Sequence, residues 1–243
     1  MNLLIDSLGL QARVHLRDGR RLADLLAALA ARPGIQTTFS TSGALSADQL
    51  RGHDVLLLTT RKKSEADYAE AELDAVEQFV RDGGGLLLMS NHGDIPGRPY
   101  PDLTASDARL ARRFGIEIEN SFFAAPEWGR PIEIPRECLN QGHPILRGIG
   151  TDNPVRSLVV NNACSIRPEG GVPLVSLPTA MLDHRDGRPP AGRCFAVARD
   201  RVVVVADSGF IGSPDTMFPG AGLLDRGDNL PIVVNMIQWL ANR

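Results

Sequence analysis

Residues 83–94 constrain the fold of this chain more than any other stretch. They read Gly-Gly-Gly-Leu-Leu-Leu-Met-Ser-Asn-His-Gly-Asp. The glycines end a helical pattern, and the four apolar residues after them have the length and composition of a strand buried on both faces. Such strands belong to α/β sheets, in which ligands bind beyond the carboxyl ends of the strands. The polar side chains that follow are therefore candidate site residues: Ser90, Asn91, His92 and Asp94.

Apolar segments of strand length alternate with helical patterns along most of the chain. The helices are predicted at residues 21–31, 64–82, 105–114 and 230–240. The strands are predicted at residues 3–5, 35–40, 54–60, 86–89, 116–118, 158–160, 174–177, 195–198 and 201–206. This alternation predicts an α/β fold with a mostly parallel, doubly wound sheet and helices on both faces.

The pattern changes between about residues 120 and 156, where prolines are frequent and periodicity is weak. We expect an irregular excursion over the edge of the sheet, and loops of this length are usually functional or disordered. Glu127 and Trp128 within it form either one wall of a ligand pocket or part of a surface loop. His143, which precedes a proline, either holds the excursion in place or takes part in a site.

Charge and hydropathy exclude several functional classes. The net charge of −3 gives no electrostatic basis for nucleic-acid binding. The short basic run Arg61-Lys62-Lys63 is more simply interpreted as a solvated loop than as a phosphate site. No apolar run approaches the roughly 20 residues of a membrane helix, and the first residues lack a signal-peptide pattern. We therefore expect no membrane insertion.

The cysteines indicate a reducing compartment. Cys138, Cys164 and Cys194 are odd in number and widely spaced, without a CxxC or Cys/His ligand spacing. This pattern disfavours a structural zinc site and is typical of a cytoplasmic protein. Cys194 begins an apolar segment, where a free cysteine acts as a small hydrophobe.

Several segments, taken in order, resemble one superfamily. They are Asp6-Ser7, residues 45–58, residues 79–85 before the buried strand, His143-Pro144-Ile145-Leu146, Ala206-Asp207-Ser208, and Asp228-Asn229 with Trp239-Leu240. Together they resemble the class I glutamine amidotransferase-like superfamily, and specifically its catalytically divergent branch. That branch includes ThuA-like proteins, domains of bacterial gliding and transport proteins, and a related ciliary domain. The resemblance covers most of the chain and implies a single domain over residues 1–243 with a flavodoxin-like sheet.

The chain departs from the amidotransferases at their catalytic turn. Those enzymes carry a cysteine nucleophile on the turn after a strand, where this chain has Ser90-Asn91-His92-Gly93. It also lacks a His-x-Glu pair near the C-terminal end. We therefore expect no glutamine amidotransferase activity. ThuA-like proteins are similar in carrying a histidine after the glycine-rich strand, which makes His92 the best-matched single residue.

Each residue of this turn has a catalytic and a structural interpretation. His92 is a general base, a metal ligand, or a turn histidine bonded to backbone. Asp94 either orients the imidazole or begins a turn. Ser90 occupies roughly the nucleophile position, but a small polar residue also fits a tight turn. Asn91 either donates to a substrate oxygen or adopts a left-handed turn conformation.

Two further strand ends are expected to converge on the same crevice. Asp6 follows the first strand, and Asp207 and Ser208 follow the strand at residues 201–206. With His92 they either bind substrate or a divalent metal, or cap neighbouring segments. No glycine-rich phosphate loop is present, so no nucleotide cofactor is indicated. No cofactor is identified, and a divalent metal stays open.

The sequence leads to two functional hypotheses. The first is a hydrolase or lyase that acts on a small polar metabolite, including carbohydrate-derived ones, with His92 as acid/base. The alternative is a non-catalytic ligand-binding or assembly domain of a transport or multiprotein system. Both imply a small-molecule ligand or a partner, and a homo-oligomer is left open.

Overall fold

The predicted parallel strands share one sheet in the computed structural model, which describes residues 1–41, 43–127, 129–149, 154–214 and 222–242. Five strands pair in parallel in the order β12-β4-β3-β1-β2. Their bounds are β1 (Asn2–Ile5), β2 (Gln36–Phe39), β3 (Val55–Thr59), β4 (Gly85–Met89) and β12 (Val202–Val205). Every residue of β3, β4 and β12 is buried, as continuous apolar runs predict.

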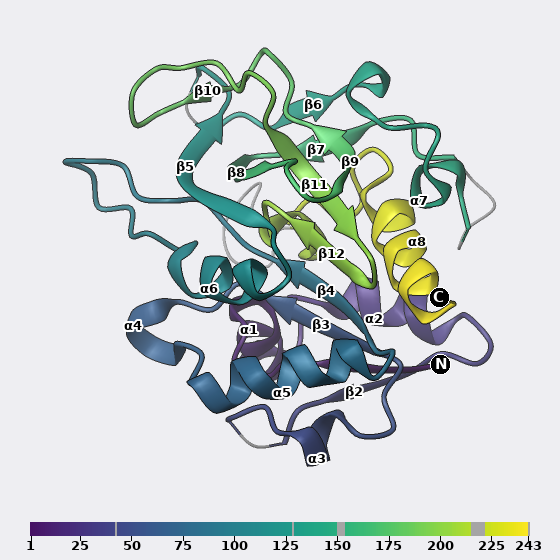
Figure 1. Ribbon diagram of the computed structural model, residues 1–243. Helices are drawn as coiled ribbons and strands as arrows, with labels where there is room; N and C mark the ends of the chain where they lie inside the picture. The colour runs from purple at the N-terminus through teal and green to yellow at the C-terminus, as the bar shows by residue number, and fades with distance from the viewer. Residues whose placement is uncertain (42, 128, 150–153, 215–221, 243) are drawn as a thin grey trace.

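Helices cover both faces of this parallel half, which confirms the predicted α/β layers (Figure 1). On one face, α5 and α6 pack against β4, and α3 packs against α5. On the other face, α8 packs against β3, β4 and β12, α1 packs against β3, and α2 packs against β2. The bounds are α1 (Leu10–Asp18), α2 (Ala23–Ala30), α3 (Ala47–Leu50), α5 (Glu70–Arg81), α6 (Ala105–Arg113) and α8 (Asn229–Ala241).

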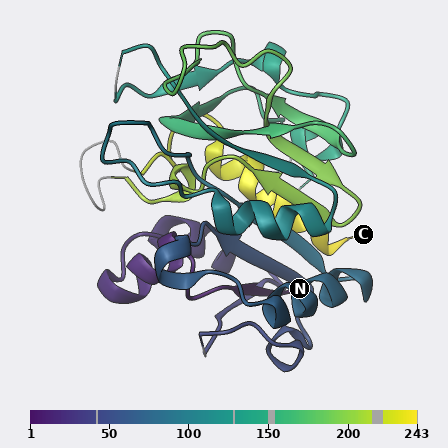
Figure 2. The same cartoon turned by 60° about the vertical axis from the view of Figure 1, so that its left-hand side comes forward.

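The other half of the sheet is antiparallel, so the sheet as a whole is mixed. Beyond β12 the order continues β11-β8-β5-β10, and β9 also pairs with β11. These strands are β5 (Glu117–Ala124), β8 (Asn162–Arg167), β9 (Val172–Ser176), β10 (Leu182–Asp183) and β11 (Cys194–Arg199). The two-residue connection between β11 and β12 forces antiparallel pairing, because parallel neighbours need a long crossover. The mostly parallel arrangement expected for the whole sheet therefore holds for β12, β4, β3, β1 and β2, and not for the antiparallel strands beyond β12. Figure 2 shows the two halves one above the other.

The proline-rich segment is more regular than expected. Within residues 120–156 lie the end of β5, β6 (Ile132–Ile134), the 3-10 turn η1 (Arg136–Cys138) and α7 (Pro144–Arg147). β6 pairs with β7 (Leu158–Val160) in a separate two-stranded sheet. Ile134 and Leu146 are buried in the main core, so this segment packs on the domain instead of looping away from it.

The helix predicted at residues 64–82 is interrupted. It forms α4 (Lys63–Ala66) and α5, with a break at residues 67–69. The break turns Tyr68 into the core, where it is 2% exposed. The neighbouring Asp67 carboxylate accepts hydrogen bonds from Ser106 Oγ and Arg109 Nη1 at 2.9 Å each. Tertiary contacts therefore outweigh the local helical pattern here.

One hydrophobic core runs through both halves of the sheet. A single cluster of buried side chains includes Leu57 and Leu88 of the parallel half and Ile166 and Phe195 of the antiparallel half. Cys164 and Cys194 are buried, Cys138 is partly buried, and all three are free. No helix in the described part of the chain combines the length and the hydropathy that crossing a membrane requires.

Candidate functional site

The polar residues predicted to converge do follow neighbouring strands. Asp6 follows β1, Arg61 lies two residues after β3, and Asn91 follows β4. Asp207 lies two residues after β12, with Ser208 next to it. Because these strands are parallel neighbours, the residues lie along one edge of the sheet, which we call the carboxyl edge.

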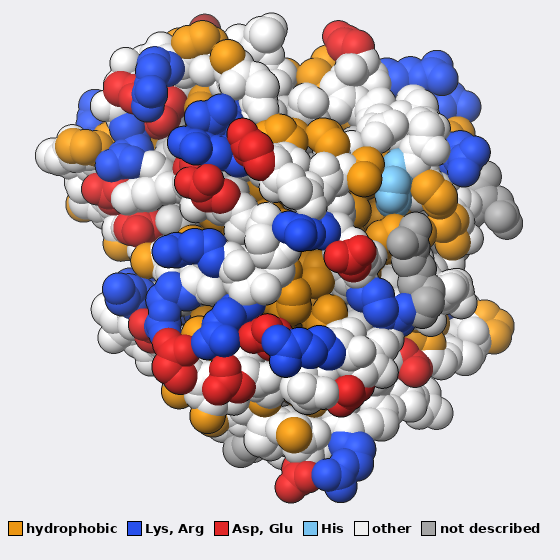
Figure 3. All heavy atoms as spheres, in the orientation of Figure 1, with side chains coloured by type: hydrophobic (Ala, Val, Ile, Leu, Met, Phe, Trp, Pro, Cys, Tyr) orange, Lys and Arg blue, Asp and Glu red, His pale blue; other side chains and the backbone are white. Residues whose placement is uncertain are grey.

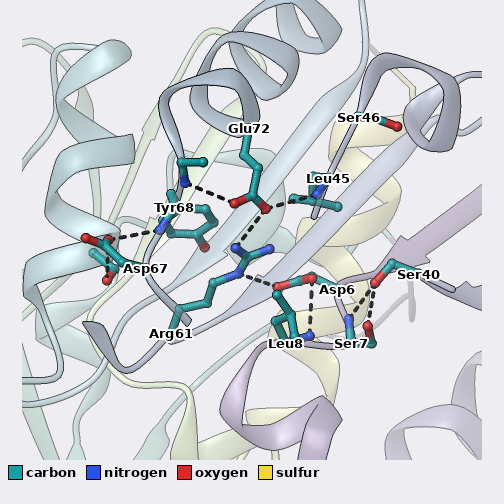
Figure 4. A network of polar contacts seen from close by, with 12 residues as sticks. Asp6, Ser7, Leu8, Ser40, Leu45, Ser46, Arg61, Asp67, Tyr68 and Glu72 are labelled. Carbon is teal, nitrogen blue, oxygen red and sulfur yellow. Dashed lines mark hydrogen bonds and ion pairs between the residues drawn. The ribbon is translucent and has the colours of Figure 1, made fainter. Parts of the chain in front are cut away.

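Arg61 is the central residue of the first part of this edge, and its position differs from the one expected from the sequence. It is fully buried, whereas the basic run at residues 61–63 was expected to be solvated. Its Nε lies 2.8 Å from Asp6 Oδ2, and its Nη1 lies 2.9 Å from Glu72 Oε1. Its guanidinium also stacks over the Tyr68 ring, 4.1 Å from the ring centroid. Figure 4 shows this network joining the ends of β1 and β3 to the start of α5.

The network keeps Arg61 charged inside the protein. Burial opposes the charge, but the neighbouring Tyr68, Asp6 and Glu72 together hold the pKa of Arg61 above its ordinary value. Glu72 also accepts hydrogen bonds from the backbone N–H of Leu45, at 2.9 Å, and of Ala69, at 3.0 Å. Asp6 is thus committed to an internal ion pair, and the structure gives no support to its predicted role in substrate binding.

Asp107, which the sequence patterns did not point to, forms the second part of the edge. Its Oδ2 lies 2.6 Å from Thr60 Oγ1, and its Oδ1 accepts from the Arg61 N–H at 3.3 Å. Thr60 Oγ1 also lies 2.8 Å from Leu103 O. One hydroxyl hydrogen cannot serve both acceptors, so a protonated Asp107 that donates to Thr60 completes the chain of bonds. Burial raises the pKa of Asp107 to about 7, while the hydrogen bonds with Thr60 and with the Arg61 N–H act in the opposite direction.

Ser90 lies beside this carboxyl group. It is fully buried, and its Oγ makes no hydrogen bond of standard geometry, although it is close enough to Asp107 to lower that pKa. The thiol of Cys164 is its other polar neighbour. A nucleophile needs a base and access to substrate. With a buried hydroxyl and, among the described residues, no imidazole bonded to it, Ser90 has the geometry of a core residue.

Asn91 and Ser208 meet, as predicted, but they bond to each other. Asn91 Nδ2 lies 3.4 Å from Ser208 Oγ, which also accepts from Gln11 Nε2 at 2.8 Å. Asn91 Oδ1 accepts the His92 N–H at 2.8 Å. These contacts tie the end of β4 to the end of β12 and to α1. The amide of Asn91 and the hydroxyl of Ser208 are therefore engaged in contacts within the protein.

The carboxyl group of Asp207 is also bonded inside the protein. It is 3% exposed, and its Oδ1 accepts the Gly209 N–H at 2.7 Å. Burial raises its pKa to about 7, while the Gly209 N–H and nearby Arg21 act in the opposite direction. Within the described ranges, neither His92 nor Asp6 forms a hydrogen bond or ion pair with Asp207. The three residues thus share an edge of the sheet without a direct bond between them in the described part of the chain.

His92 has the geometry of a neutral imidazole with one nitrogen fixed. Its ring packs 4.5 Å from the Phe122 ring and 6.0 Å from the Tyr100 ring, measured between centroids. Nδ1 lies 2.8 Å from Gly93 O, so Nδ1 carries the hydrogen and Nε2 carries the lone pair. Burial lowers the pKa of His92, and the Gly93 carbonyl and Asp102 only partly oppose this. A neutral imidazole at pH 7 can accept a proton at Nε2.

Asp94 does not orient this imidazole, contrary to the catalytic interpretation. Its carboxylate lies 3.4 Å from Arg185 Nη2, and its backbone N–H donates to Asn120 Oδ1 at 3.1 Å. The Gly93 carbonyl takes the orienting role instead. Asp94 therefore fastens its loop to β5 and to the segment after β10.

Glu127 and His143 lie outside this edge. Glu127 is exposed and pairs with Arg130, as expected of a surface loop and not of a pocket wall. Trp128 lies outside the described residues. His143 caps α7, accepting the Ile145 N–H at 3.3 Å, and its ring lies 5.1 Å from the Trp239 ring. It serves the structural role that its position before proline suggested.

A polar cavity opens beside the Asp94 loop, against β5, β8 and β10. Its volume is about 570 Å³. Its charged lining residues are Glu119, Asp183, Arg185, Asp186, Arg188 and Arg193. Most are paired: Arg193 with Glu119, Arg188 with Asp186, and Arg185 with Asp94. Its lining contains neither His92 nor a cysteine among the described residues.

No cluster of three or more His, Cys, Asp or Glu side chains in the described ranges is arranged to hold a metal ion. His92 and Asp207 are separately bonded, so the mixed oxygen and nitrogen ligand set considered from the sequence does not assemble. The structure thus offers no support for the open divalent-metal site.

Two signals could have revealed the residues that were missed. Asp107 precedes Leu110 and Ala111 by three and four positions, which places it on the apolar face of α6. Glu72 precedes Val76 by four positions on the buried face of α5. A carboxylate on an apolar helix face is almost always paired or protonated. The sequence does not reveal that their common neighbour is Arg61.

Comparison with known proteins identifies the fold. No family model matches the chain, and no curated protein matches it. The solved structure described as the mmIFT52 N-terminal domain has a TM-score of 0.69 and 14% identity, covering 98% of this chain and 97% of that chain. A structure described as a ThuA-like protein from Bacteroides uniformis ATCC 8492 has a TM-score of 0.59 and 16% identity, covering 99% and 91%.

A third solved structure comes from Thermoplasma acidophilum and is described as a GMP synthase protein. It has a TM-score of 0.52 and 15% identity, and covers 100% of this chain and 94% of that chain. At such identities the similarity shows the fold alone. The chain has an α/β fold of the kind seen in ThuA-like proteins and in this GMP synthase protein, as its resemblance to the amidotransferase-like superfamily implied.

Proposed function

We propose that this chain is a non-catalytic domain that binds a small polar ligand in the cavity beside β5. One observation carries the proposal: the carboxyl groups of Asp6, Asp107 and Asp207 at the carboxyl edge are all bonded inside the protein, while the open polar cavity lies elsewhere. Asp6 is bonded to Arg61, Asp107 to Thr60, and Asp207 to the Gly209 N–H. A role inside a transport or multiprotein system, and membership of the divergent amidotransferase-like branch, are the parts of the proposal that rest on the resemblance.

The chemistry of the cavity favours binding over turnover. Burial opposes the charge of Glu119, but hydrogen bonds from Arg193, Ser165 and Arg167 outweigh burial and lower its pKa. A carboxylate held in this way is a poor proton acceptor. The paired charges and serine hydroxyls suit an uncharged or zwitterionic ligand rich in hydrogen-bonding groups, such as a sugar derivative or an amino acid.

Ligand-observed NMR with mixtures of sugars and amino acids tests this proposal. We expect some compounds to bind, none to be consumed, and Arg188→Ala to weaken binding severalfold. Arg188 is 77% exposed, so its loss should leave the fold intact. The matched control is Arg130→Ala, another exposed arginine, paired with Glu127 away from the cavity. Binding that Arg188→Ala leaves unchanged, or no binding at all, contradicts the proposal.

The geometry of His92 supports a second candidate, the hydrolase or lyase. Its neutral imidazole, with Nδ1 fixed by Gly93 O at 2.8 Å, is poised to accept a proton at Nε2. The same NMR samples distinguish the two candidates. Consumption of a compound by the wild-type protein, reduced about 100-fold or more in His92→Ala, supports the enzyme and rejects the non-catalytic domain. His92→Ala must keep the wild-type melting temperature for this comparison.

A further inference from the structure

A groove lies on the opposite side of the sheet from the carboxyl edge, where β11 turns into β12. Its volume is about 430 Å³. Its apolar base consists of Val80, Phe114 and Val202, and its basic side chains are Arg81, Arg113, Arg199 and Arg201. Figure 3 shows a hollow near the middle of this face, with hydrophobic side chains at its base and charged side chains around it. We call it the amino-edge groove.

The charges around the groove do not balance. Four arginines face two acidic residues, Glu77 and Asp200. Arg81 and Arg113 share Glu77, and Arg113 also pairs with Glu70 and Asp74 on the surface of α5. The excess positive charge therefore lies on the β11–β12 side of the groove.

Two arginines lie on that side: Arg201 donates to Gly84 O at 3.3 Å and to Leu240 O at 3.0 Å, and the other is Arg199. Its Nη1 donates to Gly115 O at 3.1 Å, and its Nε lies 4.0 Å from a carboxylate oxygen of Asp200, which is 89% exposed. A carbonyl satisfies a donor but does not cancel the charge, and a solvated carboxylate at this distance contributes little. The guanidinium, in a side chain 39% exposed, keeps donors for an incoming anion.

The fold holds this guanidinium in place. A Cβ added at Gly115 would lie 2.1 Å from Arg199 Nη1, and one added at Gly170 would lie 2.6 Å from the same atom. Both glycines have left-handed backbone, with φ of +67° and +83°. Two turns, after α6 and after β8, therefore leave the space that the guanidinium fills. A long surface side chain held this way binds an anion at a smaller entropic cost than a free one.

We propose that the amino-edge groove binds a small organic carboxylate with an apolar body. The Arg199 guanidinium matches a carboxylate through two parallel N–H···O bonds, and the Phe114 ring with Val80 and Val202 accepts the apolar part. A volume of about 430 Å³ lies within the range of pockets that bind small molecules. This site is separate from the cavity beside β5 and does not depend on the function proposed there.

The test uses 3-phenylpropionate as the probe, with its uncharged amide as the ligand control. In two-dimensional NMR titrations of the whole chain, we expect the carboxylate to shift the amide signals of Phe114, Gly115 and Gly170. The amide should bind at least about tenfold more weakly, since it lacks the charge-assisted pair. Equal binding of the two probes, shifts at other residues, or no binding in the millimolar range overturns the proposal.

Three variants separate this site from the fold and from the other cavity. Arg199→Met should reduce affinity for the carboxylate at least about tenfold, and Arg199→Lys should restore part of it. Arg188→Ala, in the cavity beside β5, should leave 3-phenylpropionate binding unchanged. The melting temperature of each variant reports folding, and if Arg199→Met fails to fold, the comparison of acid and amide still decides the question. A folded Arg199→Met protein that binds the carboxylate normally rejects the proposal.

Discussion

At the scale of single residues, the carboxyl edge is governed by Arg61. An arginine with 0% side-chain exposure is tolerated because Asp6 and Glu72 are bonded to it and Tyr68 lies under it. Removing the cation would leave two buried carboxylates without their counter-charge. The network is thus a structural tie between β1, β3 and α5.

Arg61→Met is therefore expected to lower the free energy of unfolding by about 3–5 kcal/mol, the usual cost of breaking a buried ion pair from one side. The matched control is Arg51→Met, whose ion pair with Asp48 is 78% and 84% exposed and whose loss should cost less than about 0.5 kcal/mol. Urea unfolding of both variants measures the difference. Similar losses in the two variants would show that the Arg61 network does not stabilise the fold.

Asp107 makes stability depend on pH. Its folded-state pKa of about 7 lies above its ordinary value of 3.8. Between about pH 4 and pH 7 only the folded state keeps the proton on Asp107. The contribution of Asp107 to the free energy of unfolding is therefore complete below about pH 4 and falls by about 1.4 kcal/mol per pH unit up to about pH 7. Asp207 acts in the same direction.

Asp107→Asn should remove the part of the pH dependence of the unfolding free energy that comes from Asp107. The amide can donate to Thr60 and accept from the Arg61 N–H, as the protonated acid does, so the variant should match the wild type near pH 4 and exceed it near pH 8. Unfolding free energies measured across this range provide the test. Asp48→Asn, at an 84% exposed carboxylate, is the control and should leave the slope unchanged. An unaltered slope in Asp107→Asn would mean that Asp107 is ionised in the folded protein.

At the scale of elements, the close packing of β4 against α8 depends on Gly85. A Cβ added at Gly85 would lie 2.7 Å from Leu240 Cβ and 3.0 Å from Leu240 O, so the strand and the helix would have to separate. Gly85→Ala is expected to cost about 1–3 kcal/mol, as overpacking does. Gly43→Ala is the control, since its Cβ would meet only Leu8 at 3.8 Å. Chemical denaturation compares the two, and a neutral Gly85→Ala would show that this contact can relax.

Some helices and strands lie where the local sequence patterns predict them, and others do not. The helix stop at Gly83, with φ +99°, and the buried strand after it lie where the sequence predicts them. The helix at residues 64–82 is wrong at its start because Tyr68 leaves the helical path to reach Arg61. β8 and β10 were missed, since mixed polar and apolar strands resemble loops when neighbours are unknown.

At the scale of the whole molecule, the two halves of the sheet should unfold together. β11 and β12 are joined by a full antiparallel register, and one hydrophobic cluster includes side chains from both halves. Calorimetry is expected to show one transition whose calorimetric and van't Hoff enthalpies agree. Two resolved transitions would contradict the single domain that the sequence predicts.

In native-state hydrogen exchange, the amides of the β6–β7 pair should exchange sooner than those of β3 and β4, because the two strands lie apart from the main sheet.

The sequence by itself determined the α/β class, the five parallel strands and the edge at which Asp6, Asn91 and Asp207 lie. The strands and helices follow from apolar periodicity, which is local along the chain, and the shared edge follows from the general geometry of parallel sheets, whose strands all end on one side. Only the tertiary structure decided what those residues do. Whether a carboxylate binds a substrate or a buried arginine depends on a partner tens of residues away. Arg61 lies 55 residues from Asp6 in sequence and 2.8 Å from it in space.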